Sequence, residues 1–143
     1  LMGNQNSIQR INFEDIQHIL KNRETYCLIN TLPNNKQECL IPNTVSIDKE
    51  ESYINELLNT HLDRHIVIYG ANANDLLIYE KYDQLFKLGF KNISIYQGGM
   101  FEWLCLQDIY SDELFPTTKK EVDILKYKPI SGINKTNLYL TNY

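Results

Sequence analysis

Residues 65–104 constrain the possible folds of this chain most strongly. An apolar run at residues 66–69 stops at Gly70, and the next five residues are small or polar. A helical pattern then leads to Gly89, and a second apolar run follows at residues 93–96. Short apolar runs separated by an amphipathic helix are typical of buried strands in a parallel α/β sheet. Ligands bind at the carboxyl ends of such strands, so we expect a site at the loop that begins with Gly70.

The remaining periodic segments support the same fold class, a central parallel sheet with helices on both faces. In chain order they predict a helix over residues 12–23, a strand over 26–30, a strand over 44–47, a helix over 49–59, a helix from Asn74 or Asp75 to Leu88, and a helix over 100–107. Asn12 can cap the first helix, with Asp15 three residues later. We expect Trp103 to lie in the core.

The chain is long enough for one domain with a real core, since it has 143 residues and 43% hydrophobic residues. We predict a flexible N-terminal segment at residues 1–10, a domain at 11–116 and a basic, partly packed tail at 117–143. Leu114 and Phe115 are expected to pack back on the domain. In the tail, the residues expected to pack are Tyr127, Ile130, Leu138 and Leu140.

Charge and cysteine usage limit the location and the partners. The net charge of −4 does not favour nucleic acid as a partner. Three cysteines cannot all pair, and no stretch is long and apolar enough to cross a membrane. These features predict an intracellular, cytoplasmic protein. No residue pattern indicates a cofactor or a metal; His61 and His65 have a suitable spacing, but His65 leads directly into a strand.

The N-terminus carries a pattern that leaves two readings open. We expect Met2 to be the natural start, and the residues that follow fit the rule for N-myristoylation at Gly3. An ordinary polar N-terminus explains the same residues. One acyl chain alone gives only weak, reversible attachment to the cytoplasmic face of a membrane.

Several of these segments resemble the rhodanese-like domain family. The resemblance covers residues 11–115 and rests on the strand at 66–69, the loop that follows it, the Leu88-Gly89-Phe90 turn, the strand at 93–96, and Gly98-Gly99 with Trp103 four residues later. In this family the loop usually begins with a cysteine, which accepts sulfur as a persulfide from a donor such as thiosulfate. The matching position here is Gly70.

The rest of the loop does not supply the missing chemistry. It consists of Ala71, Asn72, Ala73, Asn74 and Asp75, which include no nucleophile and no basic residue. The carboxylate of Asp75 would repel an anionic substrate. Where the family has an Asp-x-Arg pair and a histidine, this chain has Asn30, Leu32 and Leu40. We therefore expect no catalytic residue in the loop.

Three functions remain open. The first is an inactive rhodanese-like module for protein interaction or scaffolding, with an unknown protein partner. The second is a sulfurtransferase that uses a non-standard cysteine, with Cys39 as the main candidate and Cys105 as the other. The third is anion binding without turnover, since small residues tolerate the backbone of an anion nest.

Overall fold

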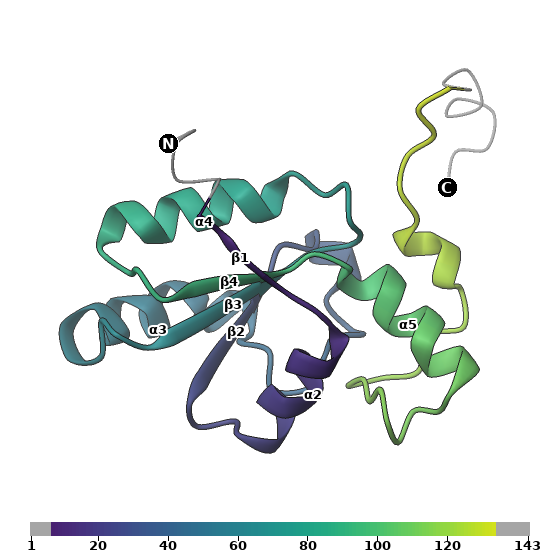
Figure 1. Cartoon of the computed structure of the whole chain (residues 1–143), viewed down its shortest axis with the longest axis horizontal. Helices are drawn as coiled ribbons and strands as arrows, with labels where there is room; N and C mark the ends of the chain where they lie inside the picture. Colours follow the sequence, from purple (N-terminus) through teal and green to yellow (C-terminus); the bar gives the residue numbers. More distant parts are fainter. Residues whose placement is uncertain (1–6, 134–143) are drawn as a thin grey trace.

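The computed structural model describes residues 7–133 and contains one parallel sheet between two layers of helices (Figure 1). The four strands lie in the order β1 (Gln9–Ile11), β4 (Ile93–Tyr96), β3 (His65–Tyr69) and β2 (Tyr26–Asn30). All three strand pairs are parallel. The predicted fold class, a central parallel sheet with helices on both faces, is confirmed.

Side chains of each strand alternate between two hydrophobic clusters, which explains the three layers. Val67 and Tyr69 pack in a cluster with α2 (Phe13–Lys21) and α5 (Gly99–Ile109). Ile66 and Ile68 pack in a second cluster with α3 (Ile47–Thr60) and α4 (Leu77–Leu88). All four of these strand residues are fully buried. Because β3 is covered on both faces, it reads as a continuous apolar run in the sequence.

Local signals place the ends of two helices close to the predicted positions. Asn12 caps α2, and its side chain and that of Asp15 accept reciprocal backbone hydrogen bonds as a capping box. Gly89 ends α4 with φ of 115°, a left-handed conformation that glycine adopts without strain. The chain then turns into β4, with Phe90 fully buried behind the turn.

The predicted strand at residues 44–47 was wrong. Thr44 makes only an isolated bridge to Leu28, and Ile47 already begins α3. Ser46 accounts for the difference, because its side chain accepts a hydrogen bond from the backbone of Asp48 and starts a helix. The hydroxyl of Thr44 donates to the carbonyl of Ile41 at 2.6 Å and also forms a hydrogen bond of 2.7 Å with the hydroxyl of Tyr69.

Both ends of the described chain differ from expectation. Gln9 and Arg10, expected in a flexible segment, belong to edge strand β1. Phe115 is buried as predicted, but Leu114 is 54% exposed. The packing prediction was also wrong for Ile130, which is 69% exposed. In the same two segments the buried side chains are Phe115 and Tyr127, the latter in a short 3-10 helix, η2 (Ile124–Tyr127).

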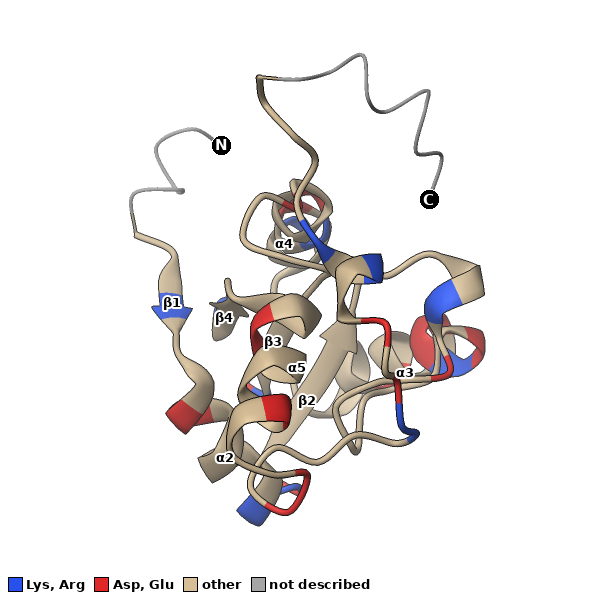
Figure 2. Ribbon diagram, turned by 90° about the vertical axis from the view of Figure 1, so that its right-hand side faces the viewer, with Lys and Arg blue, Asp and Glu red and all other residues tan. Residues whose placement is uncertain are grey.

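Three predicted features cannot be followed in the structure. Gly3, Leu138 and Leu140 lie outside the described residues. Within residues 7–133, no helix combines the length and the apolar character needed to span a membrane. Figure 2 looks at the molecule from the side of η2 and shows lysine and arginine scattered among acidic residues on that side.

Candidate functional site

Three strand ends meet around the loop that follows β3. Thr31, directly after β2, donates its backbone N–H to the carbonyl of Tyr69 at 3.0 Å. The first turn of α5 approaches from the other side, where Met100 N–H donates to Gly70 O at 3.0 Å and Phe101 N–H to Ala71 O at 2.8 Å. The loop is therefore held at the carboxyl edge of the sheet, where the sequence predicted a site.

The carboxylate of Asp75 fills the inside of this loop. Its Oδ2 accepts the backbone N–H of Ala71 at 3.0 Å and the hydroxyl of Thr31 at 3.3 Å. Its Oδ1 accepts the N–H of Leu77 at 3.0 Å, in the first turn of α4. A negative group at a helix N-terminus is favourable. The N-cap of α4 is Leu76, which has no side-chain cap, so neither Asn74 nor Asp75 is the predicted cap residue; Asp75 instead accepts the N–H of Leu77 from one position earlier.

Gly70 has no room for a side chain in this arrangement. It is buried, and a Cβ atom there would lie 2.2 Å from Asp75 Oδ2 and 2.6 Å from Thr31 Oγ1. Both distances are far shorter than a van der Waals contact. A larger residue at this position would have to displace the carboxylate from its hydrogen bonds.

Asn72 connects the loop to the C-terminal segment. Its Oδ1 accepts the N–H of Asn74 at 2.9 Å, and its Nδ2 donates to the carbonyl of Tyr127 at 2.8 Å. Asn72 is 9% exposed, whereas Ala73 and Asn74 are exposed. Sequence reasoning did not link the loop to Tyr127, because the two residues are 55 positions apart.

Gly99 allows α5 to approach the loop closely. It has φ of 66°, and a Cβ atom there would lie 2.6 Å from Gly70 O and 2.9 Å from Asn72 N. Only glycine meets both requirements without strain. This is the physical reason for the second glycine of the Gly98-Gly99 pair.

A pair of amides, Asn30 and Gln37, supports the chain after β2. Asn30 Oδ1 accepts from Gln37 Nε2 at 2.8 Å, and Asn30 Nδ2 donates to Gln37 Oε1 at 3.1 Å. Gln37 Nε2 also donates to the carbonyl of Leu32 at 2.9 Å. Asn30 is only 2% exposed. Sequence reasoning missed Gln37, since a glutamine in a polar loop carries no local signal of such a role.

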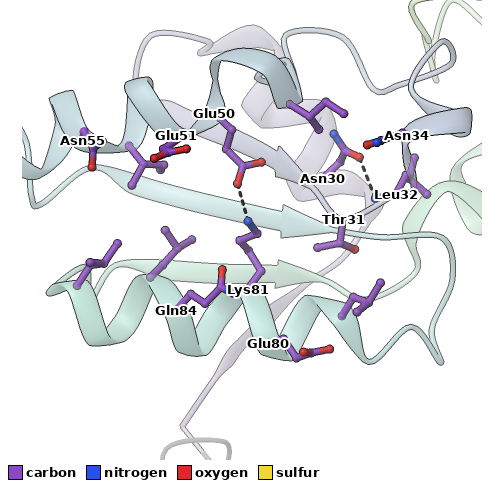
Figure 3. A pocket seen from close by; sticks show the side chains of 15 residues that line it. Asn30, Thr31, Leu32, Asn34, Glu50, Glu51, Asn55, Glu80, Lys81 and Gln84 are labelled. Carbon is purple, nitrogen blue, oxygen red and sulfur yellow. Dashed lines mark hydrogen bonds and ion pairs between the residues drawn. The ribbon is translucent and has the colours of Figure 1, made fainter.

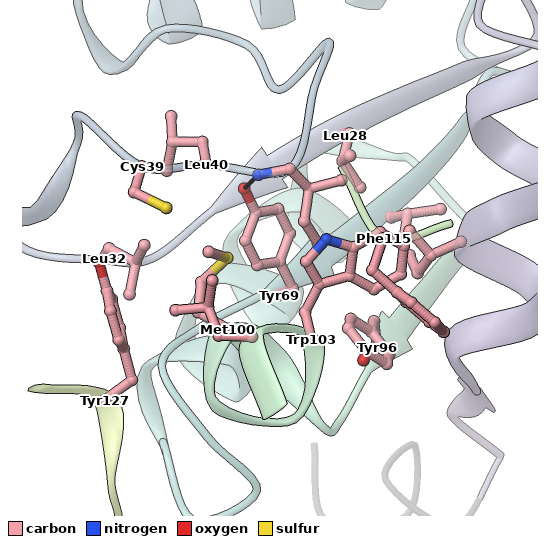
Figure 4. Close-up of a cluster of buried hydrophobic side chains, with 14 of the residues drawn as sticks. Leu28, Leu32, Cys39, Leu40, Tyr69, Tyr96, Met100, Trp103, Phe115 and Tyr127 are labelled. Atoms are coloured by element: carbon pink, nitrogen blue, oxygen red, sulfur yellow. Dashed lines mark hydrogen bonds between the residues drawn. The ribbon is translucent and has the colours of Figure 1, made fainter. Parts of the chain in front are cut away.

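Leu32 and Leu40, which stand where the family has an arginine and a histidine, lie in the hydrophobic core. Leu32 packs in the cluster that contains Tyr127 and Met100 (Figure 4). Leu40 pairs with Thr118, accepting its backbone N–H at 2.8 Å and donating to its hydroxyl at 3.0 Å. Neither position offers a polar side chain to a ligand.

The pKa of each cysteine thiol is raised, so all three favour the protonated form. Cys39 is 4% exposed, and burial raises the pKa of its thiol, despite a hydrogen bond with Thr117. Burial also raises the pKa of Cys105, with Asp108 adding to the shift. Burial raises the pKa of Cys27 to about 12. A neutral thiol is a poor nucleophile, so none of the three is activated in this structure.

A separate groove lies between α3 and α4 (Figure 3). It has a volume of about 570 Å³, and an ion pair between Glu50 and Lys81 crosses it. Thr31 contributes to this groove and also contacts Asp75, so the groove and the loop share one wall. Among residues 7–133, no group of three or more potential ligands could hold a metal ion.

Comparisons with known proteins agree with this architecture. The profile of the Rhodanese-like domain family matches residues 13–105. No curated protein sequence matches the chain significantly.

Solved structures that resemble the chain include a single-domain sulfurtransferase from Saccharomyces cerevisiae, with 14% identity and a TM-score of 0.55 over 72% of this chain and 94% of that chain. A rhodanese-like domain from Anabaena sp. has 17% identity and a TM-score of 0.53, with 86% of each chain covered. A thiosulfate sulfurtransferase from Pseudomonas aeruginosa has 13% identity and a TM-score of 0.56, but the match covers 71% of this chain and only 19% of that one. At these identities the likeness shows the fold alone. The family profile spans well over half of the chain, which therefore belongs to the rhodanese-like domain family.

Proposed function

We propose that this chain is a rhodanese-like module that has lost sulfur-transfer chemistry and acts by binding a protein partner. The observation that carries this proposal is the carboxylate of Asp75, which occupies the space beside Gly70 and binds the N–H of Ala71. The loop has therefore replaced both the nucleophile and its surroundings.

The chemistry of the family explains why this replacement would prevent sulfur transfer. A rhodanese step needs a thiolate that attacks the outer sulfur of thiosulfate, and backbone N–H groups that hold the anionic donor. Here an internal carboxylate accepts the N–H groups of Ala71 and Leu77. It would also repel thiosulfate, which carries two negative charges. The same argument disfavours the binding of sulfate or phosphate in the loop.

The alternative function is sulfur transfer through Cys39. The resemblance to sulfurtransferases in fold supports it. The burial of Cys39 and the raised pKa of its thiol argue against it. Cys105 is more exposed, but its nearest charged groups, Asp108 and Glu102, both disfavour the thiolate.

Intact-mass measurement after incubation with thiosulfate tests the proposal directly. We expect no labile gain of sulfur on the folded chain, and no sulfite released above a protein-free control. A gain of sulfur would overturn the proposal, and peptide mapping would assign it to Cys39, Cys105 or Cys27. Cys39→Ala and Cys105→Ala variants serve as controls for that assignment.

N-myristoylation of Gly3 could determine where in the cell the chain meets its partner. We propose that the chain is cytoplasmic and that N-myristoylation at Gly3 gives weak membrane association. The test is coexpression of the chain starting at Met2 with an N-myristoyltransferase. A mass gain of one myristoyl group supports the modification, and an unchanged mass leaves the ordinary polar N-terminus as the explanation.

A further inference from the structure

The chain's own C-terminal segment returns to the candidate loop and covers it. Tyr127 is 1% exposed although it lies in a 3-10 helix of only four residues. Its ring packs in the cluster with Leu32, Cys39 and Met100 (Figure 4). Its backbone carbonyl accepts a hydrogen bond from Asn72 in the loop. The Tyr127 side chain thus fills a site, called the seat below, that is formed by Leu32, Lys36, Cys39, Asn72 and Met100.

A lysine completes this seat from the other side. Lys36 Nζ lies 5.6 Å from the centre of the Tyr127 ring, a cation–π contact. The same nitrogen donates to the carbonyl of Lys126 at 2.8 Å. The polar contacts are therefore made to the backbone carbonyls of two consecutive residues, Lys126 and Tyr127. Such contacts recognise any peptide that presents an aromatic side chain at this point.

Besides Tyr127, two side chains of the segment 119–128 contact the domain: Ile124 packs against the same cluster, and Lys119 forms an exposed ion pair with Glu38. Val122 is 81% exposed and Leu125 is 59% exposed, so neither side chain holds the segment down. The ion pair between Glu121 and Lys126 joins two residues of the segment itself. Among residues 119–128 only Tyr127 is buried, so its ring makes the most completely buried contact of the segment.

We propose that this seat, formed by Leu32, Lys36, Cys39, Asn72 and Met100, is the partner-binding site of the module. The occupant is a peptide of another protein that presents one aromatic side chain, and residues 124–128 occupy the seat in its absence as an internal ligand. The proposal rests on the proposed protein-binding function. It adds the chemistry of the partner and an autoinhibitory contact that the partner must displace.

The three cysteines provide matched reporters for this displacement. Cys39 is 4% exposed and is buried in the same cluster as Tyr127 (Figure 4). Cys27 is buried in the other cluster, on the opposite face of the sheet, and reports on unfolding of the whole domain. Cys105 is partly exposed, so its alkylation serves as a control that the alkylating reagent is active.

The experiment measures iodoacetamide alkylation of each cysteine in the full chain and in a Tyr127→Ala variant, by peptide mapping over time. We expect alkylation of Cys39 to be at least about tenfold faster in the variant, because local opening no longer has to release the buried ring. The rate at Cys27 should stay slow, which also shows that the variant is folded. If Cys39 in the variant remains as slow as Cys27, the segment does not cover a separable site and the proposal fails.

A peptide added in trans tests recognition of the aromatic side chain. A synthetic peptide of residues 121–129 should restore the protection of Cys39 in the Tyr127→Ala variant. The same peptide with alanine in place of the tyrosine should not. Equal protection by both peptides would overturn the aromatic specificity.

A milder variant keeps the test valid if Tyr127→Ala does not fold. Lys36→Met removes the cation–π contact and the hydrogen bond to Lys126 while Tyr127 stays in place. It should accelerate alkylation of Cys39 by about threefold with Cys27 unchanged, and an unchanged Cys39 rate would contradict the role of the lysine. Sulfur gain from thiosulfate, measured separately, would overturn the proposed function without removing the seat, so the two failures are distinguishable.

Discussion

Restoring the family's cysteine at Gly70 should not restore sulfur transfer. In a Gly70→Cys variant, the new Cβ would lie 2.2 Å from Asp75 Oδ2. The carboxylate would have to rotate away and lose its hydrogen bonds from Ala71 N–H and the Thr31 hydroxyl. Hydrogen bonds to a charged group contribute about 1.5–3 kcal/mol each, and new contacts with water recover part of this. We therefore expect the free energy of unfolding to fall by roughly 2–4 kcal/mol.

Two assays check this prediction. Urea unfolding followed by tryptophan fluorescence measures stability, since Trp103 is the one tryptophan and is fully buried. Intact mass after thiosulfate treatment measures sulfur uptake, which we expect to be absent. A Gly70→Cys/Asp75→Ala double variant removes the crowding carboxylate and frees the N–H of Ala71 for an anion. It should gain sulfur at the introduced cysteine.

The outcomes separate two causes of the proposed inactivity. A single Gly70→Cys variant that is as stable as the natural chain and takes up sulfur would refute the reasoning, because the loss would then lie in the nucleophile alone. If the double variant also stays inert while folded, Asp75 is not the obstacle. The frame around Asn30 and Gln37 would then be the next candidate.

Three further variants test the packing around the loop and the core. Gly99→Ala should destabilise the fold by at least about 3 kcal/mol, because it adds a Cβ against backbone at a left-handed position; Gly132→Ala, with nothing within 4 Å, should be neutral in the same urea titration. Gln37→Ala should cost about 1–3 kcal/mol in that assay, since the buried Nδ2 of Asn30 loses its acceptor while Oδ1 keeps the N–H of Leu32, and an unchanged midpoint would contradict the role of this pair. Burial raises the pKa of Cys27 from 9.0 to about 12, so the unfolded chain loses this proton first as pH rises. The free energy of unfolding should therefore not depend on Cys27 below pH 9 and should fall between pH 9 and about 12. Cys27→Ala should flatten that part of the pH profile. An identical slope in both proteins would argue against the raised pKa of Cys27.

Local patterns predicted the secondary structure well where one interaction dominates. The apolar run before Gly70 was predicted as the central strand and is β3, and Gly89 marked the end of a helix because a left-handed residue was needed. The pattern failed at Thr44, where β-branched residues favour a strand but the cap provided by Ser46 starts a helix. It also failed at Leu114, since the composition of a segment does not say which of two apolar neighbours faces the core.

The sequence by itself determined the parallel α/β order and the absence of a nucleophile at Gly70. Both follow from periodicity along the chain and from the identity of one residue. Only the tertiary structure decided which groups meet around Gly70: Asp75 beside Thr31, and Tyr127 against Asn72. These pairs lie 44 and 55 residues apart, and no local preference links them. They form because the sheet brings its strand ends together and each buried polar group must then find a partner.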